Sequence, residues 1–213
     1  CLRLSAVCLM SNYDPVSQSV MPGRAGRWDG SLQDVPPAGR QALRCGGFAR
    51  ASGDISDELS DEQIRRKIRD EYLRDSTVTI LLVGTETKNR KHIDWELYSS
   101  MIDGVVNKKS GILVIQLPST NPRHLYVTHG DLEKAIYPNT TWQTIATRAE
   151  FEQRHPFLPE RIIDNLLKPE AKISVTSWGG LDAEKIRLLI DLTFNDKGKC
   201  EYDLSRPMRR YNS

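Results

Sequence analysis

Two continuous apolar runs constrain the fold of this chain more than any other feature. They are 78–83 (VTILLV) and 111–118 (GILVIQLP), and neither shows the polar alternation of a half-exposed strand. Such runs predict strands that are buried on both faces, as in a parallel sheet. Gly84 follows the first run and Pro118 ends the second, so both strands have a defined end.

Helical patterns precede and follow the first strand. Ser60 and Gln63 form a capping box, and apolar residues then recur every four positions, which predicts an amphipathic helix over 60–74. After the polar loop TETKNRK, the segment HIDWELYSSMIDG predicts a helix that ends at Gly104. Its core stripe consists of Ile93, Leu97 and Met101.

The second half of the chain repeats this alternation less regularly. Residues 119–160 carry four prolines and predict an irregular insertion with short elements. PERIIDNLL (159–167) predicts a short helix, and AKISVTSW (171–178) is a weaker strand pattern. DAEKIRLLIDLTF (182–194) predicts a closing helix whose inner face carries Ile186, Leu189, Ile190 and Phe194.

Alternating helices and buried strands predict an α/β fold, in which right-handed crossovers join the strands of a parallel sheet. We expect a flavodoxin-like arrangement flanked by helices. Such a sheet needs one or two further strands from before residue 54, and we find no strand pattern there.

Residues 1–53 differ from the α/β domain predicted for 54–213. Residues 1–52 contain six Arg and six Gly but no Lys or Glu, and all eleven Lys lie later in the chain. Their Pro-Gly, Pro-Pro and Gly-Gly pairs are typical of loops or disorder. Two interpretations stay open: a natural flexible extension, or a segment translated in the wrong frame with its first strand lost.

Composition excludes several function classes. The net charge is +2, and the basic cluster at 65–69 alternates with acids, which indicates a solvated helix face and no nucleic-acid partner. No run reaches the roughly 18 apolar residues of a membrane span. The four cysteines form no CxxC pair and no zinc-ligand spacing occurs, so we expect free thiols, surface or loop histidines, no metal and a cytoplasmic location.

Glu96 is the candidate functional acid. It falls in the first turns of the helix that follows a buried strand, and ligands of parallel sheets gather beyond the carboxyl ends of the strands. Gly84 and Thr85 would lie across the same crevice. Acids are also common near helix N-termini because they complement the helix dipole, and Asp94 would serve that purpose as well. Spacing alone leaves both interpretations open.

The segment IRRKIRDEYLRDSTVTILLVGTETKNRKHIDWEL carries a family resemblance. It resembles the TIR-like family that includes the ThsB proteins of Thoeris antiphage defence, whose pattern is S-x-V-T-x-x-L-x-G-x-x-T, a basic loop and W-V-x-x-E. The matching positions are Ser76, Val78, Thr79, Leu82, Gly84, Thr87, Arg90 and Glu96. The family's usual Trp four places before the Glu is His92 here, and Trp95 lies beside the Glu instead.

The resemblance implies a flavodoxin-like TIR domain and an activity. Many members cleave NAD+ between nicotinamide and ribose, and some cyclise the ADP-ribose product into a diffusible signal for a partner effector. It implies that Glu96 is the catalytic acid of an intact protein with NAD+ as substrate and no further cofactor, and Thr85 and Trp95 are weaker candidates for the ligand wall. A packing role for Trp95, a non-enzymatic module that signals by self-association, and an inactive fragment stay as alternatives.

Overall fold

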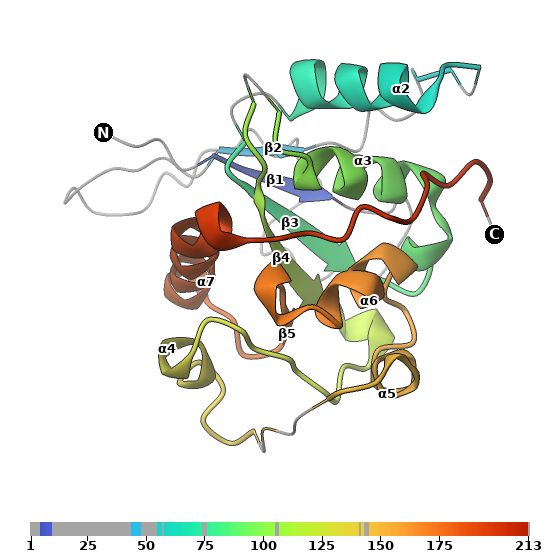
Figure 1. The fold of residues 1–213 in the computed structure, drawn as a ribbon. Helices are drawn as coiled ribbons and strands as arrows, with labels where there is room; N and C mark the ends of the chain where they lie inside the picture. The colour runs from blue at the N-terminus through green and yellow to red at the C-terminus, as the bar shows by residue number, and fades with distance from the viewer. Residues whose placement is uncertain are drawn as a thin grey trace, which may run out of the picture.

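The computed structural model has a parallel sheet between two layers of helices (Figure 1). It describes residues 5–9, 44–47, 55–56, 58–73, 76–104, 107–140, 142 and 145–212. The strand order is β2-β1-β3-β4-β5, and every neighbouring pair is parallel. This is the flavodoxin-like order, so the predicted fold class is confirmed.

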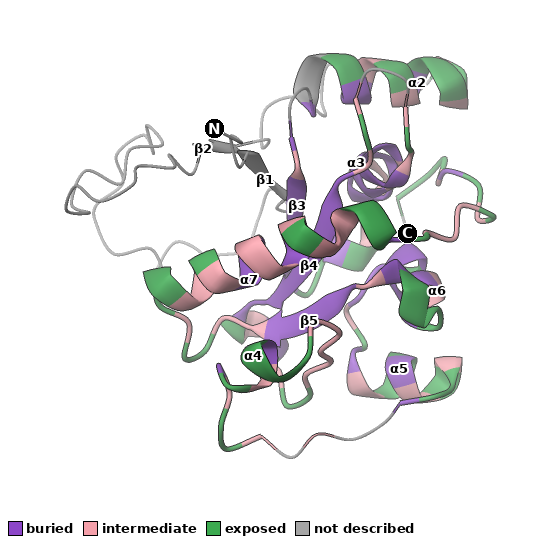
Figure 2. Cartoon of the chain, turned by 60° about the vertical axis from the view of Figure 1, so that its left-hand side comes forward, coloured by how far each residue is buried: buried purple, intermediate pink, exposed green. Residues whose placement is uncertain are grey.

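The two apolar runs form the centre of the sheet. β3 (Val78–Val83) pairs with β4 (Gly111–Gln116) over its whole length, and all twelve residues are buried. β5 (Ser174–Ser177) pairs with β4, and its outer edge forms a single antiparallel bridge with Tyr126. Figure 2 shows these three strands buried in the centre of the molecule, except for Ser177 at the end of β5, which is partly exposed.

The other side of β3 pairs with strands from the N-terminal segment. β1 (Ser5–Leu9) lies beside β3, and β2 (Arg44–Gly47) forms the edge. These strands differ from our expectation that the segment supplies none. Parallel pairing uses backbone groups, so a short run such as RCGG can join an edge without any side-chain pattern. The rest of the 1–53 prediction falls on residues outside those described.

Helices cover both faces of the sheet. One layer holds α2 (Asp61–Lys67), α3 (Lys91–Met101), α5 (Arg148–Arg154) and α6 (Glu160–Leu166), which pack against the alternate β3 residues Leu81 and Val83. The other layer is built mainly by α7 (Ala183–Asp196), beside the short α4 (Asp131–Lys134). Leu189 and Ile190 of α7 pack against Val78, Ile80 and Leu82.

Local signals in the sequence predicted the start of α2 but placed the end of α3 three residues too late. The capping box of Ser60 and Gln63 is present, and α2 continues as a π-helical turn over Ile68–Tyr72. α3 ends at Met101, three residues before Gly104, because Ile102 is extended. The Ser110 N–H donates a hydrogen bond to the Ser100 carbonyl at 2.9 Å, so the chain approaching β4 satisfies this helix end.

Two expectations about surface polarity were wrong. Arg69 is only 3% exposed, and its guanidinium approaches the Asn107 carbonyl and the Ser110 hydroxyl. His155 is 1% exposed and shares a 3.2 Å hydrogen bond with Gln116, and burial lowers its pKa to about 4. Both residues contact segments that are distant in the sequence, which local patterns do not reveal.

Gly111 marks the closest approach of α7 to the sheet. A Cβ at this position would lie 2.7 Å from both Cγ2 and the carbonyl oxygen of Thr193. We predict that Gly111→Ala lowers the free energy of unfolding by about 1–3 kcal/mol, because the backbone must shift. Gly198→Ala is the control, since its Cβ would meet no atom within 4 Å. Urea unfolding of the two variants tests this, and equal stabilities would contradict it.

Candidate functional site

The strand order makes the neighbouring strands β1 and β3 the place where a ligand site is expected. The chain leaves β1 towards β2 on one side and returns through β3 to the other, which makes this pair the switch point of the sheet. In open α/β sheets, ligands bind at such points, beyond the carboxyl ends of the strands. Leu9, the last residue of β1, is paired with Leu81, and β3 continues two residues further to Val83. The loop 84–90 therefore leaves the sheet at this switch point.

This loop is folded around one threonine. Thr87 is buried, and its hydroxyl accepts a 2.9 Å hydrogen bond from the Gly84 N–H. A 3₁₀ turn over Thr87–Asn89 then leads into α3. Thr85 and Glu86 are exposed at the tip of the loop. Thr85 thus lies in the loop that leaves the switch point, and its contact with a ligand stays a prediction.

Glu96 lies in the second turn of α3 and is only 5% exposed. Ser100, one turn later on the same side of the helix, accepts a 3.0 Å hydrogen bond from the Thr79 hydroxyl on β3. The Glu96 side of α3 therefore faces the sheet. No hydrogen bond to the Glu96 carboxylate is present among the described residues, and burial raises the pKa of this group to about 8.

Asp94, the other acid of this helix, has a different environment. It lies two residues before Glu96, a rotation of about 200° around the helix. The Arg161 guanidinium donates to both of its carboxylate oxygens, from Nε at 2.7 Å and from Nη2 at 3.0 Å. The Arg209 N–H donates a third hydrogen bond at 2.9 Å. Asp94 is therefore a structural acid, fully engaged on the side of α3 away from Glu96.

Trp95 is buried against the C-terminal tail. It is 1% exposed, and its Nε1–H donates a 2.7 Å hydrogen bond to the Arg209 carbonyl. The edge of its ring meets His92, with centroids 5.1 Å apart. The structure gives Trp95 a packing contact, and its role in the ligand wall stays a prediction.

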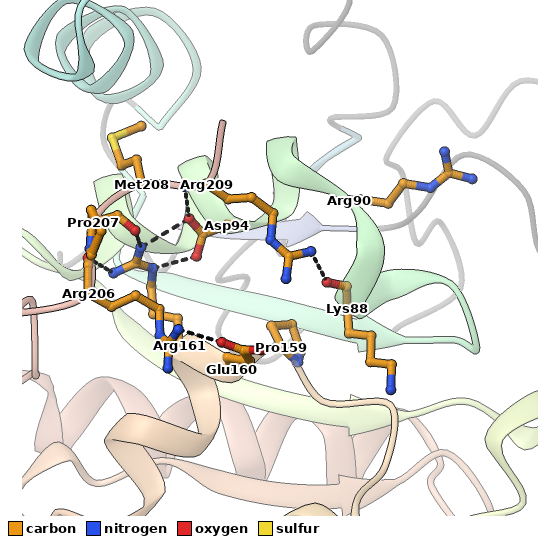
Figure 3. Close-up of a pocket in the computed structure, with 10 residues that line it drawn as sticks. All are labelled: Lys88, Arg90, Asp94, Pro159, Glu160, Arg161, Arg206, Pro207, Met208 and Arg209. Carbon is orange, nitrogen blue, oxygen red and sulfur yellow. Dashed lines mark hydrogen bonds and ion pairs between the residues drawn. The ribbon is translucent and has the colours of Figure 1, made fainter. Parts of the chain in front are cut away.

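A basic pocket of about 240 Å³ opens on the Asp94 side of α3 (Figure 3). The first turn of α3, the start of α6 and the tail form its walls, and Glu96 is not among its lining residues. Arg161 is held by Asp94 at its centre, whereas the Arg90 side chain points away. The lining residues are Lys88, Arg90, Asp94, Pro159, Glu160, Arg161, Arg206, Pro207, Met208 and Arg209.

Sequence reasoning missed Arg161 and the tail residues that meet α3. Arg161 follows the first residue of a helix of ordinary composition, and it lies 67 positions from its partner Asp94. Neither spacing nor charge patterning indicates such a pair. Within the described ranges, no group of three or more His, Cys, Asp or Glu side chains is placed to hold a metal ion.

Comparison with known proteins gives one match to a family model. Residues 41–122 match the family model of the Thoeris protein ThsB, TIR-like domain. No curated protein and no solved structure matches the chain. The matched segment includes β3, its loop, α3 and β4, and thus all the residues on which the resemblance was based. Across residues 41–122, the chain is therefore similar to the TIR-like domain of the ThsB proteins.

Proposed function

We propose that the intact protein cleaves NAD+ between nicotinamide and ribose, with Glu96 as the catalytic acid. One observation carries the proposal. The segment that matches the ThsB TIR-like domain holds a buried glutamate in the helix that follows β3, one of the two strands at the switch point of the sheet. The other acid of that helix, Asp94, is occupied by Arg161.

The chemistry suits a single buried carboxylate. Breaking the bond between nicotinamide and ribose leaves positive charge on the ribose ring, as in glycoside cleavage. A carboxylate held nearby stabilises that charge or binds the ribose hydroxyls, and its effect is large where water is excluded. Nicotinamide leaves as a neutral molecule, so the reaction needs no second acid to protonate it.

The raised pKa of Glu96 fits a role that begins with substrate binding. With a pKa of about 8, the carboxyl group is largely protonated at neutral pH in the ligand-free protein. The positively charged nicotinamide ring favours the ionised form of a nearby acid. Binding of NAD+ would therefore generate the carboxylate where the positive charge develops.

The consequences of cleavage form the finer part of this proposal. ADP-ribose, released linear or cyclised, would act as a diffusible signal to a partner effector in Thoeris antiphage defence, in the cytoplasm. Such a protein needs no membrane anchor, and no helix among the described residues is long and apolar enough to cross a bilayer. NAD+ serves as substrate, and the proposed chemistry uses no further cofactor.

The activity prediction concerns the Glu96 carboxylate. We predict that the full chain releases nicotinamide from NAD+ and that Glu96→Gln lowers kcat at least 100-fold, on the order of the loss seen when one charge-stabilising group is removed. Chromatography of the products measures the release. Glu170→Gln is the control, because Glu170 is an exposed acid before β5, outside α3. Absence of release from the wild type, together with stable oligomers on size exclusion, would favour the interaction module.

The stability prediction follows from the same carboxyl group. Its pKa rises from an ordinary value near 4.5 to about 8 on folding, so the folded state binds an extra proton between these values. The contribution of Glu96 to the free energy of unfolding is fully present below pH 4.5 and is lost as the pH rises towards 8. We predict that Glu96→Gln raises the Tm relative to wild type increasingly from pH 5 to pH 9. Thermal melts at matched ionic strength test this, and a pH-independent difference would contradict it.

A further inference from the structure

The end of the chain runs as an extended strap across α3 and α6. We define the C-terminal strap as residues 203–212; it contains no helix or strand. Figure 1 shows this segment crossing the helical layer beside α3. Arg210 at its far end bonds the Leu59 carbonyl and pairs with Asp61 at the start of α2. The strap therefore connects three helices of one layer.

The strap holds the first turns of α3 at three points. The Arg209 N–H donates to the Asp94 carboxylate at 2.9 Å, and the Arg209 carbonyl accepts from the Trp95 indole at 2.7 Å. The Asn212 side-chain oxygen accepts from the Lys91 N–H at 2.9 Å. Arg90, the N-cap residue of α3, makes no side-chain capping bond of its own. Asn212, 121 residues later in the chain, thus accepts a hydrogen bond from a backbone N–H at the start of α3 that has no partner within the helix.

A buried arginine joins the strap to α3 through α6. The Arg161 side chain is fully buried, and it donates to the Arg206 carbonyl from Nη1 and to the Pro207 carbonyl from Nη2, both at 3.0 Å. The same guanidinium binds Asp94 through two hydrogen bonds. Asn165, one turn later, exchanges hydrogen bonds with the backbone N–H and carbonyl of Asp203. On the strap side, the contacts of Arg161 and Asn165 all use backbone atoms. They therefore depend on the path of the strap backbone and not on which side chains it carries.

We infer that the C-terminal strap is a positioning element for Glu96, acting through Asp94 and Trp95. Asp94 and Glu96 face nearly opposite directions around α3. The strap and Arg161 grip the helix on the Asp94 side, and the hydrogen bond between Thr79 and Ser100 holds it on the Glu96 side. A rotation of α3 that moved Glu96 would break contacts on both sides. The catalytic consequence rests on the proposed function, whereas the effect on α3 does not.

Point variants in the full chain test this role. Asn212→Ala removes the cap of α3, and Trp95→Phe removes the hydrogen bond to Arg209 while keeping an aromatic ring. Tyr211→Ala is the matched control, because Tyr211 lies in the strap but is 82% exposed. We expect amide hydrogen exchange within 91–101 to become about fivefold faster in the first two variants, as for loss of about 1 kcal/mol of hydrogen bonding. The control should be unchanged.

Two further measurements separate positioning from general destabilisation. An NMR titration of the Glu96 carboxyl group should give a lower midpoint in Asn212→Ala and in Trp95→Phe than in the wild type. The reason is that a shifted α3 lets water reach the group. If the wild type releases nicotinamide, kcat should fall in these two variants while KM stays nearly constant. Only the acid is displaced, and the other residues of the site keep their positions.

The outcomes distinguish the two proposals. If amide exchange in α3 and the Glu96 titration are unchanged in both Asn212→Ala and Trp95→Phe, the positioning role is overturned. A lower kcat in Trp95→Phe with unchanged α3 exchange would overturn it in favour of direct ligand contact by Trp95. A wild type that releases no nicotinamide would end the proposed function, and the exchange and titration results would still decide the role of the strap.

Discussion

The pairing of β3 with β4 is the constraint on which the rest of the structure depends. Six residue pairs, from Val78 and Gly111 to Val83 and Gln116, join two strands whose side chains are buried on both faces. Each face then requires its own layer of helices, because an uncovered apolar face would remain in water. The layers approach closely enough that Gly111 has no room for a Cβ beneath Thr193 of α7. Parallel pairing also sends the loops after β3 and β4 to one edge of the sheet, where the candidate site lies.

Helix α3 places two acids in opposite environments within a single turn. Asp94 is buried with a bidentate arginine and a backbone donor, so its charge is compensated by contacts. Glu96 is equally buried but receives no hydrogen bond from any described residue, and desolvation alone raises its pKa. The ionised form of such a buried, unpaired carboxyl group lowers the free energy of unfolding. Groups of this kind are typical of functional sites, where stability is lost in favour of activity. The arrangement separates the structural acid from the candidate catalytic one.

Some of the contacts that position the helix of Glu96 come from outside the segment that matches the family model. The match ends at residue 122, whereas Arg161 and the C-terminal strap lie beyond it. The strap provides two of the hydrogen bonds in the Arg161 contact and the cap of α3. Helix α3 of the matched segment is therefore held in part by segments that lie outside the match. The strap meets Arg161 and Trp95 through its backbone carbonyls, whereas the cap of α3 needs the Asn212 side chain.

The sequence by itself determined the elements whose signals are local. The apolar runs 78–83 and 111–116 predicted the central strands, and Ser60 and Gln63 predicted the start of α2. The motif around Glu96 indicated the similarity to the TIR-like domain of ThsB. Only the tertiary structure decided the burial of Arg69, the pairing of Asp94 with Arg161 and the contact of Trp95 with the strap. These depend on segments 38 to 114 positions away, which no periodicity encodes. Local patterns report which face of an element is apolar, but the polar partner that a distant segment brings to it is known only once the chain has folded.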